Sequence, residues 1–222
     1  MKFHDIYSKV KHKTNVLICV DRDGTLIYDN KYHLGHQKNW KSKIRILPSV
    51  IQGLKLLKKI KNSSIYVLSN QPGLAIKDFK LLTIEREHEV CKEVLRRIKN
   101  KGADINGYFF CPYASPEFVK KHKEFNFDKK FVKDCYCMKP HPGMIFSALE
   151  KEGLTEEDTC IYFIGDRFSD VKTGINAGGI GIFVPFKKEK QEIKKVEKSK
   201  IKKIYKAKNF LDAAKFIYQL EN

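Results

Sequence analysis

The 222-residue sequence contains no long hydrophobic run and few arginines. No stretch approaches the roughly 18 consecutive apolar residues that a membrane-spanning helix requires. The first residues, MKFHDIYSKVKHKTN, lack the apolar core of a secretory signal, so we expect a cytoplasmic protein. The hydrophobic fraction of 42% is enough for one sizeable core, and we therefore expect a single domain over residues 1–222.

The net charge is +18, yet only six of the 44 basic residues are arginines. Positive charge favours nucleic-acid binding, because lysine and arginine bind phosphates. Recognition of bases and bidentate recognition of phosphate favour arginine, however, so a general preference for lysine explains the charge equally well. Eleven lysines and three glutamates give residues 187–208 a net charge of +8, which is typical of a solvated surface.

Short runs of aliphatic and aromatic residues alternate with helical patterns along most of the chain. This alternation predicts an α/β fold with a doubly wound parallel sheet. The predicted strands cover residues 16–20, 65–69, 108–111, 161–165 and 180–184. The predicted helices cover residues 49–61, 78–100, 144–151 and 170–177.

Residues suited to phosphate chemistry follow several of the predicted strands. In doubly wound sheets ligands bind at the carboxyl ends of the strands, so we expect these residues to meet at one edge. Several carboxylates with one lysine suit a hard cation such as Mg²⁺ and a phosphoryl group. They come from the motifs DRDGT, SNQPG, KPHPG and GDRFSD and are Asp21, Asp23, Ser69, Asn70, Lys139, Asp166 and Asp170.

Asp21 and Asp23 are separated by a single residue. Two carboxylates this close repel each other unless a cation or a proton lies between them. One of them can attack phosphorus to form an aspartyl-phosphate, and the other can donate a proton to the leaving oxygen. Each motif alone is common in turns and helix caps, but four in this order indicate a phosphatase site.

The four motifs resemble those of the haloacid dehalogenase (HAD) superfamily, phosphatase branch, over most of the chain to about Phe186. DRDGT, SNQPG, CYCMKPHPGM and GDRFSD are similar to the group of heptose 1,7-bisphosphate and histidinol-phosphate phosphatases. The resemblance implies a Rossmann-like fold without a large cap domain, with a small flap over residues 27–47 and a cysteine-containing loop. In the flap, His33, His36 and Trp40 either line the substrate or are surface histidines and a packing tryptophan.

The resemblance also implies a role for each matching residue. Asp21 would be the nucleophile and Asp23 the acid/base, while Ser69, Asn70 and Lys139 would bind phosphate. The residues implied at the magnesium site are Asp21, Asp23 through its backbone carbonyl, and Asp166, with Asp170 in a supporting role.

Many members of this group carry a structural zinc in a loop with a Cys-x-His and a Cys-x-Cys motif. Cys111, Cys135 and Cys137 match the cysteines, but Tyr113 occupies the expected histidine position. Structural zinc requires four nitrogen or sulfur ligands. Either His122 supplies the fourth ligand or the site holds no metal, and the three matching cysteines favour zinc.

A second departure is Met138, because relatives usually have arginine directly before the lysine. The preferred substrate is a sugar phosphate, with a heptose bisphosphate first and histidinol phosphate as an alternative. A nucleic-acid 3′-phosphatase and an inactive relative that binds a partner through its basic segment are further alternatives. The cysteine loop argues against a nucleic-acid 3′-phosphatase. An inactive relative is disfavoured by four intact residues, Asp21, Asp23, Lys139 and Asp166.

Overall fold

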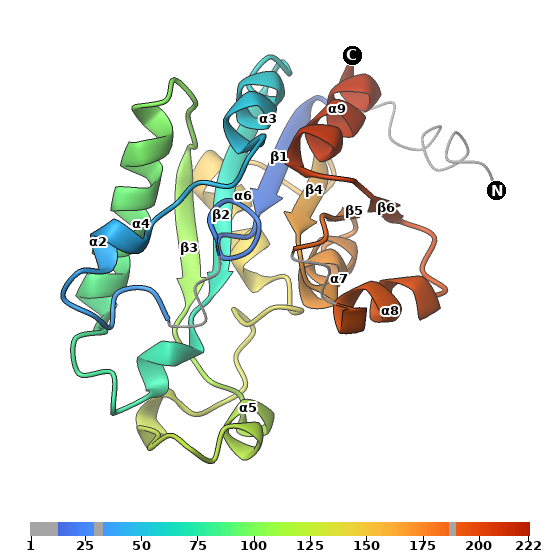
Figure 1. Ribbon diagram of the computed structural model, residues 1–222. Coiled ribbons are helices and arrows are strands. Elements are labelled where there is room, and N and C mark those ends of the chain that lie inside the picture. Colours follow the sequence, from blue (N-terminus) through green and yellow to red (C-terminus); the bar gives the residue numbers. More distant parts are fainter. Residues whose placement is uncertain (1–12, 29–32, 187–189) are drawn as a thin grey trace.

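The computed structural model describes residues 13–28, 33–186 and 190–222, and its centre is one six-stranded parallel sheet (Figure 1). The strand order is β3-β2-β1-β4-β5-β6, which confirms the predicted doubly wound α/β fold. The sixth strand was not predicted, because it lies within the lysine-rich segment. The strands are β1 (Asn15–Val20), β2 (Ser63–Asn70), β3 (Gly107–Cys111), β4 (Thr159–Gly165), β5 (Ile180–Phe183) and β6 (Ile204–Lys206).

Helices connect the strands, and four of them correspond to the predicted ones, α3, α4, α6 and α7. Helix α4 begins later than predicted, because the Thr83 side chain accepts a hydrogen bond from the Arg86 N–H and caps it there. Among the residues described, no helix combines the length and apolar character of a membrane span. The helices are α2 (Trp40–Lys43), α3 (Val50–Leu57), α4 (Ile84–Lys99), α5 (Pro116–Lys121), α6 (Gly143–Glu152), α7 (Phe168–Asn176), α8 (Lys190–Lys198) and α9 (Phe210–Glu221), with 3₁₀ turns η1 (Pro72–Ala75) and η2 (Lys129–Phe131).

Alternate residues of the central strand β1 pack into two separate cores, because successive strand side chains point to opposite faces. Val16, Ile18 and Val20 belong to the main core with residues of α3, α4 and α9. Leu17 and Cys19 belong to the second core with residues of α6. Helices therefore cover both faces of the sheet, as expected for buried parallel strands.

The carboxyl ends of β1 and β4 lie side by side, because Val20 pairs with Ile164 in the parallel register. The chain leaves β1 toward α3 on the main-core face, whereas helix α6, which leads into β4, packs on the second-core face. The strands point toward the end of the molecule that carries α5 (Figure 1). This switch point is where doubly wound sheets bind ligands.

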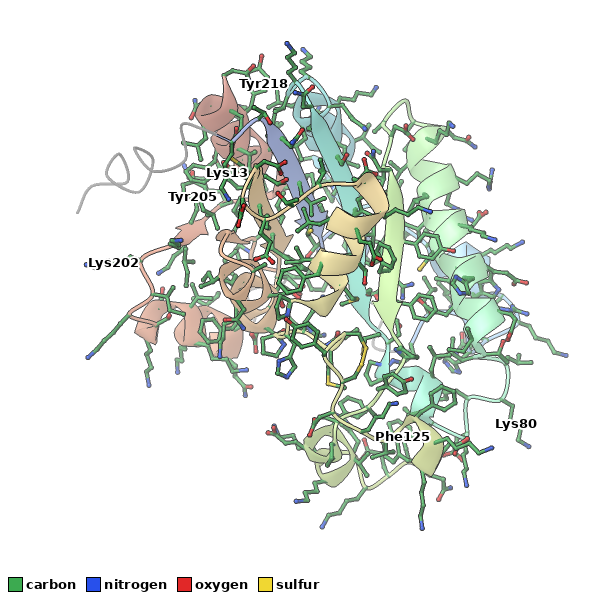
Figure 2. All side chains as sticks on the ribbon, turned by 180° about the vertical axis from the view of Figure 1, so that it is seen from behind. Lys13, Lys80, Phe125, Lys202, Tyr205 and Tyr218 are labelled. Carbon is green, nitrogen blue, oxygen red and sulfur yellow. A yellow bond between two sulfur atoms is a disulfide. The ribbon has the colours of Figure 1, made fainter. Side chains whose placement is uncertain are left out.

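Two short segments lie at this end in place of a large cap domain. The first is the predicted flap, of which residues 29–32 lie outside the described ranges. Its Trp40 is 2% exposed and packs in the main core, so the packing alternative for this residue is confirmed. The second is the cysteine-containing loop between β3 and α6, which carries α5, η2 and Phe125 (Figure 2).

The lysine-rich segment contributes to the fold through α8 and β6. Val196 of α8 is buried against Val171 and Phe183 in a small third core. Glu192 accepts a hydrogen bond from the Phe168 N–H at the start of α7. Lysines such as Lys202, between these two elements, extend outward (Figure 2).

Candidate active site

A cavity of about 710 Å³ opens at the carboxyl ends of the strands. Five of the predicted catalytic and phosphate-binding residues line it, whereas Asp166 lies beside it and is 2% exposed. The structure therefore brings these residues together at this edge. The five lining residues are Asp21, Asp23, Ser69, Asn70 and Lys139.

Asp21 follows β1 directly and is almost fully buried. Its Oδ1 lies 2.5 Å from Lys139 Nζ. Burial raises the pKa of Asp21 to about 6; the Lys139 charge opposes this rise, and the charges of Asp170 and Asp23 add to it. Lys139 thus favours the ionised form that a nucleophile requires.

The Lys139 ammonium group lies between two carboxylates. Besides Asp21, it contacts Asp170 Oδ1 at 2.7 Å and donates to the Leu68 carbonyl at 3.1 Å. Burial alone would lower the pKa of Lys139, but the two carboxylates hold it above its ordinary value. The Asn70 amide fixes the backbone of Lys139, accepting from its N–H at 3.0 Å and donating to its carbonyl at 3.2 Å.

The Asp23 carboxylate is held by two residues that the sequence analysis did not single out. Arg22 Nε and Nη2 lie 3.0 and 2.8 Å from Asp23 Oδ2, and Gln71 Nε2 donates to the same oxygen at 2.9 Å. Gln71 also donates to Ser69 Oγ at 2.8 Å. Burial would raise the pKa of Asp23, but the Arg22 charge and the hydrogen bonds from Arg22 and Gln71 together outweigh it and hold the pKa below its ordinary value.

Three carboxylates converge beside Lys139, and oxygens of Asp21, Asp166 and Asp170 lie within 4.8 Å of one another. Burial, followed by the charges of Asp21 and Asp170, raises the pKa of Asp166 to about 9. One lysine does not neutralise three buried carboxylates, so this donor set fits a hard divalent cation. Asp170 uses its other oxygen to accept from the Arg167 N–H at 2.9 Å, which agrees with a supporting role.

Gly24 allows the chain to turn directly after the second aspartate. Its φ of +94° lies in the left-handed region, and a β-carbon there would overlap the Asp166 carboxylate. Only glycine therefore lets the DRDGT segment approach the end of β4 this closely.

The three predicted zinc cysteines also converge. Cys111 Sγ lies 2.9 Å from Cys137 Sγ, and Cys135 forms a disulfide with Cys137. Within the described ranges, no histidine, carboxylate or fourth cysteine joins this cluster. Tyr113, at the expected histidine position, packs against Phe131.

The interpretation of His122 as the fourth zinc ligand is wrong. His122 directly follows α5 and lines the active-site cavity, where Nδ1 lies 3.0 Å from Glu124 Oε1. Helix α5 carries this side chain to the cavity side of the loop, away from the sulfur atoms.

Aromatic rings from three separate segments line the outer part of the cavity. In the flap, His33 and His36 lie 5.4 and 4.4 Å from the Phe79 ring, so both histidines line the cavity. Phe79 in turn contacts Phe125 of the cysteine loop at 5.5 Å. Burial lowers the pKa of His33 to about 4, so this ring is neutral at pH 7.

Few permanent positive charges line the cavity. Among the lining residues that the structure describes, these are Lys139 and Arg167. Met138, at the position where the resemblance implies an arginine, packs against the second core and does not line the cavity.

Comparisons with known proteins agree with this geometry. The HAD-hydrolase-like family model matches residues 136–213. A D-glycero-alpha-D-manno-heptose-1,7-bisphosphate 7-phosphatase from Photorhabdus laumondii is 29% identical over 172 residues, which is 76% of this chain and 81% of the relative. The Escherichia coli K12 D-glycero-beta-D-manno-heptose-1,7-bisphosphate 7-phosphatase is 27% identical over 161 residues, covering 72% of this chain and 73% of the relative.

The fold is also similar to that of solved structures. A D,D-heptose 1,7-bisphosphate phosphatase from B. bronchiseptica, complexed with magnesium and phosphate, matches with a TM-score of 0.69 and 19% identity. The match covers 91% of this chain and 98% of that one. The predicted resemblance to HAD phosphatases is thus confirmed, in the family model over residues 136–213 and in the heptose-bisphosphate phosphatases over about three quarters of this chain.

Proposed function

We propose that this protein is a magnesium-dependent phosphatase that hydrolyses a sugar phosphate through an aspartyl-phosphate, with D-glycero-D-manno-heptose 1,7-bisphosphate as the preferred substrate. The observation that carries the proposal is the pair Asp21 and Asp23 at the switch point, with the Lys139 ammonium 2.5 Å from the Asp21 carboxylate. We further propose that residues 1–222 act as one phosphatase domain.

In the first step, an Asp21 carboxylate oxygen attacks phosphorus and the bond from phosphorus to the sugar oxygen breaks. The bound anionic phosphate group raises the pKa of the neighbouring Asp23, which enters this step protonated and gives its proton to the departing oxygen, so that an alcohol leaves. Lys139, Ser69 and the Asn70 region bind the equatorial oxygens, where negative charge must be offset. Mg²⁺ bound by Asp21, Asp166 and the Asp23 carbonyl would neutralise the remaining charge on the phosphoryl group.

In the second step, water attacks the aspartyl-phosphate. Asp23, now ionised, takes a proton from this water while the bond from phosphorus to Asp21 breaks. Inorganic phosphate leaves and Asp21 is regenerated. One carboxylate therefore acts first as acid and then as base.

The substrate class is supported by the relatives and by the cavity. The two curated relatives act on heptose 1,7-bisphosphate according to their names. The rings of Phe79 and Phe125 offer an apolar wall for a sugar face, as is usual in ligand pockets. None of the described residues of the lysine-rich segment lines the cavity, which argues against a nucleic-acid end as substrate.

We also propose that Cys111, Cys135 and Cys137 hold a structural zinc when the disulfide is reduced. Three thiolates are suitable soft ligands, and they fill three of the four positions that zinc prefers. Such a zinc would tie the segment before Lys139 to the end of β3 and would take no part in the chemistry.

The test is phosphate release in the presence of Mg²⁺ from heptose 1,7-bisphosphate, histidinol phosphate and a 3′-phosphorylated oligonucleotide. Asp21→Asn keeps the shape of the side chain but removes the attacking charge, so turnover should fall to background. Asp104→Asn, at an exposed position, is the matched control and should keep full activity.

Two results would contradict the proposal. Retention of even about a tenth of the wild-type turnover by Asp21→Asn would exclude the covalent mechanism, because nucleophilic catalysis requires that carboxylate. A higher kcat/KM for the oligonucleotide than for the sugar phosphates would replace the substrate assignment.

A further inference from the structure

A buried line of charged side chains runs from helix α4 to the active-site cavity. Glu87 of α4 and Arg22 are both 0% exposed, and Arg22 Nη1 forms an ion pair with Glu87 Oε1. The opposite edge of the same guanidinium holds Asp23 Oδ2 through Nε and Nη2. Glu87 is thus connected to the proposed proton donor through one rigid, planar group.

Stability does not explain this arrangement. Burying an ion pair removes two charges from water, and replacing such a pair with apolar residues of similar volume is often neutral or stabilising. Glu87 Oε2, in addition, has no hydrogen-bond partner among the described residues, which is costly in a buried site. The nearby buried positions of α4, Val90 and Val94, are apolar, so an apolar pair in place of Arg22 and Glu87 would suit the core.

The arrangement does restrict how Asp23 can rotate. Arg22 and Gln71 both donate to Oδ2, and within the described part of the chain no hydrogen bond reaches Oδ1. One carboxylate oxygen is therefore anchored and the other is available for proton exchange. Without Glu87, the guanidinium would keep Asp23 but lose the contact that fixes its own orientation.

We propose that Glu87 is a positioning residue, which acts through Arg22 to orient the Asp23 carboxylate for proton transfer to the leaving group. This inference rests on the proposed function, since it assumes that Asp23 is the general acid. It predicts that loss of Glu87 harms only those reactions in which the leaving group needs a proton.

The test compares two substrates at saturating Mg²⁺. A sugar phosphate leaves as an alkoxide unless it is protonated, whereas 4-nitrophenyl phosphate leaves as a stable phenolate without a proton. Because general acid catalysis contributes roughly 10²–10⁴-fold, misorientation in Glu87→Gln should lower kcat/KM for the sugar phosphate by about 10- to 100-fold. The kcat/KM for 4-nitrophenyl phosphate should change less than about threefold, because it reports only the steps up to departure of the leaving group, and this phenolate leaves without a proton.

Two further variants separate orientation from packing. Glu87→Asp restores the charge and should recover part of the lost kcat/KM, while Arg22→Lys keeps the charge but lacks the fork and should show the same substrate selectivity as Glu87→Gln. Glu89→Gln, at an exposed position on the same helix, should behave as wild type. Thermal unfolding of each variant verifies that the protein is folded.

The outcomes distinguish this inference from the function on which it rests. If Asp23→Asn lowers kcat/KM selectively for the sugar phosphate but Glu87→Gln and Arg22→Lys do not, the positioning role is wrong and the proposed function stands. An equal loss of kcat/KM on both substrates in the Glu87 and Arg22 variants would show a structural role only and would also overturn the inference. If Asp23→Asn itself shows no selectivity, the acid role fails and the inference fails with it.

Discussion

Replacing Lys139 with methionine removes the ammonium group that lies between two buried carboxylates. In the wild type, Nζ lies 2.5 Å from Asp21 Oδ1 and 2.7 Å from Asp170 Oδ1, and all three side chains are at most 8% exposed. Methionine fills a similar volume without charge. The variant therefore leaves Asp21, Asp166 and Asp170 together in one buried site without a positive side chain between them.

The expected cost is large because, among the described residues, Lys139 is the cation that forms ion pairs with these two carboxylates. Breaking a buried ion pair by removing one partner typically costs about 3–5 kcal/mol, since the remaining charge stays buried. For a protein of this size, about 1 kcal/mol corresponds to roughly 2–4 °C in Tm, so Tm should fall by roughly 6–20 °C. The free energy of unfolding is measured by urea denaturation at neutral pH. EDTA is present so that no divalent cation compensates for the lost positive charge of Lys139.

Two companion variants make the result interpretable. Lys92→Met, at an exposed position in α4, should change the free energy of unfolding by less than about 0.5 kcal/mol, as surface substitutions usually do. Adding Asp170→Asn to Lys139→Met removes one of the crowded charges and should recover part of the lost stability. If Lys139→Met stays within about 1 kcal/mol of wild type, the site does not depend on this cation and the electrostatic argument is refuted.

Two further predictions concern the surface of α4 and the cysteine cluster. Hydrogen bonds from Arg96, with further help from Arg97, lower the pKa of Glu93 from 4.5 to about 2, so its ion pairs stabilise the fold above about pH 4.5 and are lost as the pH falls toward 2. Glu93→Gln should thus cost about 0.5–1 kcal/mol in urea denaturation at pH 7, and a deficit that did not narrow below pH 4.5 would contradict the ion-pair explanation. Elemental analysis of protein purified with reductant should find about one zinc per chain. Tyr113→His should slow zinc release to a chelator, because it adds a fourth ligand. Absence of zinc from both the wild type and this variant would refute the proposed zinc site.

Most of the predicted site residues that the structure brings together lie within a few residues of a strand end, the exception being Lys139, which lies before α6. Val20 pairs with Ile164, so the chain positions directly after these strands must lie side by side. Asp21 and Asp166 therefore meet whatever the loops do. The alternation of strands and helices in the sequence is enough to predict such neighbours, because the register of a parallel sheet fixes which residues lie side by side at the ends of its strands.

The errors concern residues whose positions depend on loops. His122 lies between Cys111 and Cys135 in the sequence, but α5 places it on the cavity side of the loop. The strand at Ile204–Lys206 lies within a run of lysines that hides its short apolar pattern. In both cases tertiary contacts decide the position, and neither periodicity nor ligand spacing reports them.

Arg22 falls between these two cases, and its position can be rationalised from strand geometry. Val16, Ile18 and Val20 face the core that contains α4, and Arg22 continues the even-numbered series beyond the end of β1. Asp21 and Asp23 continue the odd-numbered series. An arginine between these two aspartates is thereby directed toward α4, and its burial there requires an acidic partner. Glu87 meets that requirement from 65 residues away, a separation at which the sequence alone gives no indication of the pairing. The DRDGT motif thus predicts that a counter-charge exists, whereas only the packing of α4 on the sheet identifies it.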